Sequence, residues 1–184
     1  MLLNCKQKAL LCFSIIISIV IKVSSSHLDI TSIKCKNSDA SFANFTKCFN
    51  KRISRWISET TINITFANAI NKIIGKIGLY KLSNNKYNQY LFKETTFDGC
   101  KFLLKRSSFP MVDYLYKQIE KYTNLNRTCP LRNYVLMNRM RIDMEKQKWL
   151  PLANGDYSVF TRWLVAGKER FAVDFYFAFR EEKN

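Results

Sequence analysis

Alternating apolar and polar residues near the carboxyl end of the chain give its clearest structural signal. Apolar side chains occupy every second position of residues 171–179, and residues 157–165 alternate in the same way. A period of two predicts β-strands that turn one face toward a core. Because only a short segment containing Gly167 separates the two stretches, residues 157–180 are predicted to form an antiparallel β-hairpin.

Several other segments have the length and the alternation of β-strands. In residues 61–67, Ile62, Ile64 and Phe66 share one parity and Asn63 has the other, which predicts an apolar inner face and a polar outer face. The remaining strand candidates are residues 31–37, 42–51, 75–82, 88–98 and 134–142, with a polar turn at residues 83–86.

One segment departs from the strand pattern. Pro110 suits the first turn of a helix, and Val112, Leu115 and Ile119 follow at helical spacing. We therefore expect one short amphipathic helix at residues 109–123. About eight short strands with one helix predict a mostly β fold, an immunoglobulin-like two-sheet antiparallel β-sandwich, with a closed barrel of the lipocalin kind as the alternative.

The amino-terminal segment has the order of a secretory signal peptide. Two lysines precede an apolar run at residues 9–21, and small residues follow at 23–26. The run is shorter than the roughly 20 residues that cross a bilayer, which disfavours the alternative of a retained membrane anchor. The sequence thus predicts a signal peptide at residues 1–26, a single domain at residues 27–184, and a secreted protein without a transmembrane segment.

Loss of this segment would leave four cysteines, Cys35, Cys48, Cys100 and Cys129. An even number of cysteines in an exported protein predicts two disulfides. Three pairings are possible, and we favour the local one, which joins Cys35 to Cys48 and Cys100 to Cys129. A zinc site is disfavoured because the chain has no CxxC pair and its only histidine, His27, would lie at the mature terminus.

Charge and glycosylation signals describe the surface. The chain carries a net charge of +16, and removal of three lysines with the signal would leave +13. The excess favours anionic partners or simply a soluble cationic surface. Nucleic acid is disfavoured because the chain is exported and shows no recognised binding motif. Sequons at Asn44, Asn63 and Asn126 predict outward-facing, glycosylated positions.

Catalytic constellations are not evident. A nucleophile would need a base, and His27 lies on a terminus. We expect no cofactor and no enzymatic activity. The acidic residues that could serve as paired carboxylates are scattered, namely Asp98, Asp113, Asp143, Asp156 and Asp174.

Several motifs occur in a characteristic order. They are Ile33-Lys34-Cys35, Phe45-Thr46-Lys47-Cys48, Asp98-Gly99-Cys100-Lys101-Phe102-Leu103, Asn124-Leu125-Asn126-Arg127-Thr128-Cys129-Pro130, and Leu150-Pro151-Leu152 with Gly155-Asp156-Tyr157. In this combination the chain resembles the insect family DUF1091, with Arg127 in place of the histidine usual there.

The resemblance implies a secreted β-sandwich related to the MD-2-like lipid-recognition domains, a group that includes the GM2-activator protein. In that fold two splayed sheets hold an apolar ligand. The resemblance extends to the fly CheA and CheB groups, which are associated with contact chemosensation. A carrier of a pheromone or a cuticular lipid is therefore one expected role.

Our preferred hypothesis is non-enzymatic binding of a hydrophobic small molecule or lipid in a cavity between the sheets. The alternative is an extracellular interaction module with a filled core that docks a receptor through its basic surface, and a secreted hydrolase is a third, weaker hypothesis. Parity decides which residues face inward, so an error of one residue in register would turn them outward. The predicted lining residues are Phe66, Leu79, Leu91, Leu115, Leu136, Met140, Trp163, Phe175 and Phe177.

Overall fold

The computed structural model of the chain describes residues 25–55, 57–91, 94–142 and 152–182. The predicted signal peptide therefore lies outside the described residues, apart from its last two. None of the helices in these ranges is both long and apolar enough to span a membrane.

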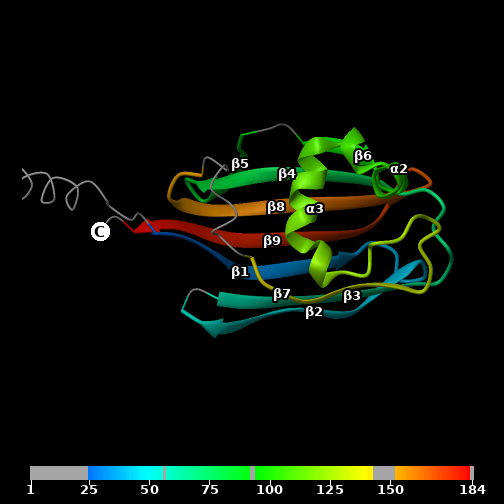
Figure 1. The fold of residues 1–184 in the computed structure, drawn as a ribbon, viewed down its shortest axis with the longest axis horizontal. Helices are drawn as coiled ribbons and strands as arrows, with labels where there is room; N and C mark the ends of the chain where they lie inside the picture. The colour runs from blue at the N-terminus through cyan, green and yellow to red at the C-terminus, as the bar shows by residue number, and fades with distance from the viewer. Residues whose placement is uncertain (1–24, 56, 92–93, 143–151, 183–184) are drawn as a thin grey trace, which may run out of the picture.

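The strands form two antiparallel sheets that face one another (Figure 1). The large sheet has the order β1-β9-β8-β4-β5, and β6 also pairs with β4, whereas the small sheet has the order β2-β3-β7. The predicted two-sheet β-sandwich is confirmed. The strands are β1 (Ser25–Asn37), β2 (Ala43–Ser54), β3 (Ile57–Phe66), β4 (Ile74–Ser83), β5 (Lys86–Gln89), β6 (Thr95–Asp98), β7 (Tyr134–Met140), β8 (Gly155–Val165) and β9 (Lys168–Glu182).

Two tight hairpins in the large sheet follow directly from turn residues in the sequence. The β8–β9 turn consists of Ala166 and Gly167, with φ values of 52° and 75°, and the β4–β5 turn consists of Asn84 and Asn85, with φ values of 50° and 59°. Positive φ at both central residues matches the right-handed twist of the flanking strands. The predicted 157–180 hairpin and the predicted polar turn at 83–86 are both confirmed.

The single strand predicted at residues 88–98 is wrong. Strand β5 ends at Gln89, and pairing with β4 resumes only in β6 at Thr95. Between them Leu91 has a φ of 63°, a left-handed conformation that a leucine adopts only outside regular strands. Two short strands therefore follow one another along the same edge of β4.

The two sheets are tied together along one edge, where β1 lies beside β2 and β3. The disulfide joins Cys35 of β1 to Cys48 of β2. At a bulge in β1, the carbonyl oxygen of Ile30 accepts hydrogen bonds from the Asn50 side-chain amide at 2.7 Å and the Ser58 hydroxyl at 3.0 Å. We call this edge the seam, defined by the disulfide and these two hydrogen bonds.

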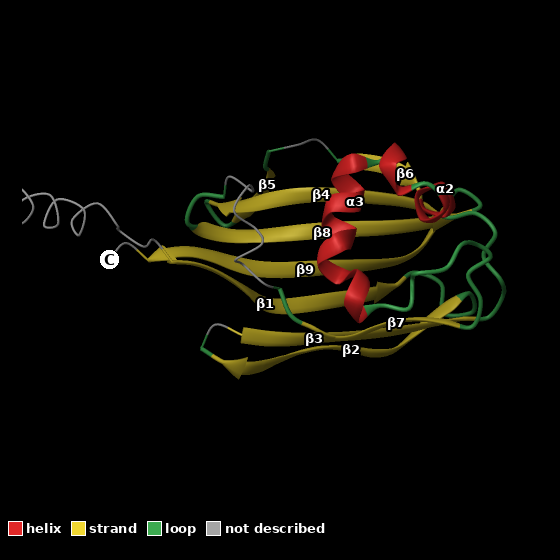
Figure 2. Cartoon of the chain, viewed as in Figure 1, coloured by secondary structure: helices red, strands yellow, loops and turns green. Residues whose placement is uncertain are grey.

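The opposite edge is covered by helices. Helix α2 (Gly99–Leu104) follows β6 and begins at Asp98, whose side chain accepts a hydrogen bond from the Lys101 backbone N–H at 3.0 Å. Helix α3 (Pro110–Ile119) begins with the predicted proline and lies within the predicted helical segment. Figure 2 shows α3 crossing the strands from the side of β6 toward β7.

The far end of α3 is fastened to the small sheet. A 3₁₀ turn at Glu120–Tyr122 leads to Asn124. The Asn124 backbone N–H donates a hydrogen bond to the carbonyl oxygen of Leu136 in β7 at 3.1 Å, and the Leu136 backbone N–H donates one to the Asn124 side-chain oxygen at 2.9 Å. The second disulfide joins Cys100 of α2 to Cys129, which precedes β7. Both disulfides have the favoured local pairing. The first joins strands of the two sheets, and the second joins helix α2 to the segment that leads into the small sheet.

Removal of either disulfide should lower the free energy of unfolding, and the disulfide that closes the longer loop should contribute more. Replacing Cys100 and Cys129 with alanine should lower the free energy of unfolding by about 3.5 kcal/mol, and replacing Cys35 and Cys48 by about 3 kcal/mol, because the loops they close differ in length. The sequence separations are 29 and 13 residues. Urea unfolding of the two double variants measures both values, and an equal or reversed order would contradict an effect on the unfolded chain.

A buried carboxylate on the small sheet predicts a pH dependence. Hydrogen bonds from Arg139, and then from Arg141, hold the pKa of Glu59 below its ordinary value of 4.5. A lowered folded-state pKa stabilises the protein above the unfolded-state pKa, and this stability is lost as pH falls through the folded-state pKa.

Glu59→Gln should therefore unfold at lower urea than the wild type near neutral pH, and the difference should shrink in acid. The matched control is Glu94→Gln, because Glu94 makes only an exposed pair with Lys76 at 3.9 Å. A difference for Glu59→Gln that is independent of pH would show that the ion pairs with the two arginines are not its cause.

Candidate functional site

A cavity of about 340 Å³ lies between the two sheets and helix α3. Its walls come from the inner faces of both sheets, from α2 and α3, and from the segments that connect them. Almost all of the described side chains that line it are aliphatic or aromatic. A volume of this size falls in the range of small-molecule sites in proteins.

The large sheet provides the most regular wall. Along β9 one parity faces the cavity, as the alternation in the sequence predicted, and β8 contributes three inward positions in the same way. The indole ring of Trp163 stacks on Phe171, with centroids 6.0 Å apart. The inward residues of these two strands are Val159, Thr161, Trp163, Phe171, Val173, Phe175 and Phe177.

The small sheet provides the facing wall, and a bulge in β7 changes its parity. Val135 and Met137 face the cavity, but so does Met140, three positions further along. The pairing register shifts between the pairs Ile62–Met137 and Thr60–Met140, because β7 has one extra residue there. Arg139, which lies in this bulge, has a φ of 50°. The bulge thus brings two methionines into the same cavity wall.

Helix α3 closes the cavity with one face. Val112, Leu115, Tyr116 and Ile119 follow the spacing that places side chains on a single helical stripe, and all four line the cavity. Burial raises the pKa of the Tyr116 phenol, which donates a hydrogen bond to the carbonyl oxygen of Leu125 at 2.9 Å. The hydroxyl is therefore kept protonated and engaged.

The few polar groups in the wall bond mainly to the protein itself. The Thr161 hydroxyl donates to the carbonyl oxygen of Val173 at 2.7 Å and accepts from the Trp163 indole N–H at 3.1 Å. The side-chain amide of Gln118 donates to the carbonyl oxygen of Tyr114 at 3.3 Å. Because these polar groups bond to the protein, the wall is suited to an apolar ligand. Gln118 keeps further hydrogen-bonding capacity, since its side-chain amide has two N–H donors and an acceptor oxygen.

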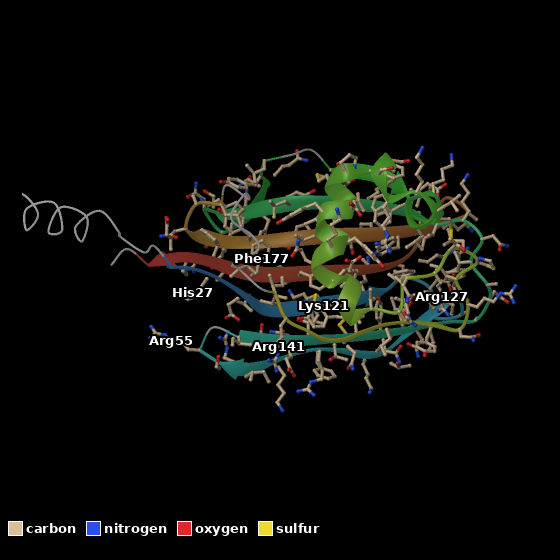
Figure 3. The ribbon with its side chains drawn as sticks, viewed as in Figure 1. His27, Arg55, Lys121, Arg127, Arg141 and Phe177 are labelled. Carbon is tan, nitrogen blue, oxygen red and sulfur yellow. A yellow bond between two sulfur atoms is a disulfide. The ribbon has the colours of Figure 1, made fainter. Side chains whose placement is uncertain are left out.

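Seven of the nine predicted lining residues contribute to the cavity wall. They come from both sheets and from α3, so the structure brings together residues far apart in the sequence. The seven are Phe66, Leu79, Leu115, Met140, Trp163, Phe175 and Phe177. Figure 3 labels Phe177, which lies on β9 in the large sheet.

The other two predicted lining residues, Leu91 and Leu136, do not line the cavity. Leu91 is 50% exposed, because it lies in the irregular segment between β5 and β6. Leu136 pairs with Asn63 and lies on the outer face of the small sheet. Although Leu136 and Met140 are an even number of residues apart, the bulge at Arg139 between them places their side chains on opposite faces. Counting by twos backward from Met140 therefore gives the wrong face.

Several lining residues were missed. Ile62 and Ile64 share the parity of Phe66, so the same alternation could have identified them. Leu28 and Ile30 of β1 also line the cavity. They lie just after the predicted signal peptide and before the strand predicted at residues 31–37, and a bulge follows Ile30. Residues in connecting segments, such as Leu131, carry no periodic signal.

The three sequons differ in exposure. Asn44 and Asn126 are exposed, whereas Asn63 is only partly exposed on the outer face of the middle strand of the small sheet. Near the third sequon, Arg127 donates hydrogen bonds to the carbonyl oxygens of Arg132 at 3.2 Å and Tyr134 at 2.8 Å. This arginine therefore stabilises the loop that leads into β7.

The acidic residues are engaged in structural contacts rather than assembled into a cluster. Asp113 pairs with Lys117 at 2.9 Å, and Asp156 pairs with Arg180 at 2.7 Å. Asp98 begins helix α2, Asp174 pairs with Arg162, and Asp143 lies outside the described residues. Among the described residues no three histidine, cysteine or acidic side chains are close enough to hold a metal ion.

Comparison with known proteins identifies one family. Residues 75–159 match the model of DUF1091, described as a protein of unknown function. The matched stretch runs from β4 through both helices and β7 into β8, and so includes the helical cover and much of the cavity wall. No curated protein matches the chain. The motifs around Cys100, Cys129 and Gly155 lie within the match, and the resemblance to DUF1091 is confirmed over residues 75–159.

Proposed function

We propose that this protein is a secreted, non-enzymatic binding protein that holds an apolar small molecule or lipid between its two sheets. The observation that carries the proposal is the cavity of about 340 Å³ with its almost wholly apolar wall. An apolar ligand gains there both burial from water and close contacts with the side chains of the wall.

The size of the cavity supports a bound ligand energetically. An apolar ligand that fills this space would gain about 25 cal/mol for each Å² of its surface that leaves water.

Secretion and a carrier role complete the proposal. Two disulfides fit an oxidising compartment, and the apolar run at residues 9–21 fits a signal peptide. The exposed sequons at Asn44 and Asn126 are suitable acceptors for glycans. The resemblance to the MD-2-like domains and to the CheA and CheB groups extends the proposal to a carrier of a pheromone or a cuticular lipid.

The alternative is an interaction module that docks a receptor through its basic surface. The net charge of +16 favours it. However, that hypothesis assumes a filled core, and the space between the sheets weighs against it. Hydrolysis by paired carboxylates is disfavoured because the described acids serve in helix capping and ion pairs.

The proposal is tested by identifying what the protein carries. The protein, secreted from insect cells and purified without detergent, is extracted with organic solvent, and the extract is compared by mass spectrometry with that of a mock purification. A lipid present in stoichiometric amount supports the proposal. If none co-purifies and neither added fatty acids nor added cuticular hydrocarbons bind, the receptor-docking alternative takes its place.

A substitution in the wall should weaken binding. Leu115→Trp places a larger side chain in the cavity and should lower affinity for a fluorescent fatty acid about tenfold. This corresponds to roughly two methylene groups of the ligand that are no longer buried in the cavity. Leu104→Trp is the matched control, because Leu104 is 75% exposed on α2. Fluorescence titration measures both, and unchanged affinity in Leu115→Trp would place the ligand elsewhere.

A further inference from the structure

The end of the small sheet at the β2–β3 turn exposes large aliphatic side chains. Ile53 and Ile57, on either side of the turn, are each 44% exposed, and Phe49 on the same hairpin is 49% exposed. Half of the exposed large hydrophobic side chains of the described residues thus lie on this one hairpin. Exposed apolar groups gathered in one place are a common mark of an interaction surface.

Arginine side chains lie near this turn in the strand pairing, and the acids that pair with them are buried. The side chains of Arg52, Arg139 and Arg141 are 51%, 67% and 47% exposed. Their partners Asp29 and Glu59 are only 9% and 8% exposed. The ion pairs therefore hold the guanidinium groups at the surface and keep the carboxylates beneath them.

Exposed Lys51 and Arg55 add to the positive charge of this end. Figure 3 shows Arg55 at the turn of the hairpin and Arg141 toward the same end of the small sheet. Among the described residues, these five cations and two acids sum to a net charge of about +3, which attracts an anionic surface within about a Debye length. We call it the hairpin end, defined by Lys51, Arg52, Ile53, Arg55, Ile57, Arg139 and Arg141.

The hairpin end adjoins the cavity. A small notch in the surface is lined by Ile57, Ser58 and Arg141 together with residues of β1 and of the segment after β7. Those further residues, Leu28, Ile30 and Ile142, also line the large cavity. The side chains of Leu28, Ile30 and Ile142 therefore lie between the notch and the cavity, where a ligand could pass if they moved apart.

We propose that the hairpin end docks on an anionic lipid bilayer and that ligand exchanges between the bilayer and the cavity there. Aliphatic side chains set among cations enter the boundary between headgroups and acyl chains, while the cations contact anionic headgroups. An acidic protein would pair with the cations but gives no reason for two isoleucines flanking the turn. The inference deepens the proposed function, on which the exchange of ligand rests.

The test measures co-sedimentation of the secreted protein with vesicles of phosphatidylcholine and phosphatidylserine, and with vesicles of phosphatidylcholine alone. The wild type should bind the anionic vesicles and release them as salt is added. The double variant Ile53→Ser with Ile57→Ser should bind them at least about tenfold more weakly, since it loses several methylenes that enter the bilayer.

Matched controls come from the opposite end of the sandwich. Leu104→Ser with Tyr134→Ser removes two side chains that are 75% and 44% exposed, and it should leave vesicle binding unchanged. For charge, Lys51→Gln with Arg55→Gln should weaken binding, whereas Lys101→Gln with Lys105→Gln at the exposed surface of α2 and its end should have a smaller effect.

Binding of a fluorescent fatty acid in the absence of vesicles separates this inference from the proposed function. The isoleucine variant should keep wild-type affinity for the fatty acid but take lipid up from anionic vesicles about tenfold more slowly. The docking proposal is overturned if the wild type does not bind anionic vesicles, if the isoleucine variant binds as the wild type does, or if the Leu104 and Tyr134 control loses as much. Failure of fatty acid binding with vesicle binding intact would overturn the proposed function alone.

Discussion

The seam that ties β1 to the small sheet holds one edge of the sandwich closed. The Cys35–Cys48 disulfide and the two hydrogen bonds to the Ile30 carbonyl hold the sheets together along one edge. Helix α3 reaches across the opposite edge, and the pairing of Asn124 with Leu136 fastens its end to β7. Because both edges are fixed by covalent and hydrogen bonds, the inner faces need not collapse onto one another, and a cavity remains between them.

Alternation in the sequence predicted the structure well wherever the strands are regular. On β8 and β9 the inward residues, from Trp163 to Phe177, follow the period of two, and short turns fix their register. The same reasoning failed at the β7 bulge, where one extra residue turns Leu136 outward while Met140 stays inward. Bulges depend on pairing between distant strands, so a single-sequence pattern does not reveal them.

Other features depend on tertiary contacts that no local pattern encodes. Helix α2 was not predicted because its six residues are too few for a helical period, although Asp98 as a capping residue was available as a signal. Leu91 has an apolar side chain in an apparently strand-like segment, yet the chain leaves the sheet there. The local disulfide pairing was favoured in advance, whereas the role of the Cys35–Cys48 disulfide in connecting the two sheets follows only from the topology.

If a ligand occupies the space between the sheets, the methionine methyl groups in the cavity wall should detect it. Met137 and Met140 line the cavity, whereas Met111 on α3 does not contribute to its wall. The protein labelled with ¹³C at its methionine methyl groups is titrated with a spin-labelled fatty acid, and the methyl resonances are followed by NMR. The account predicts that the Met137 and Met140 resonances broaden far more than that of Met111. Saturable binding that leaves both cavity resonances sharp would contradict it.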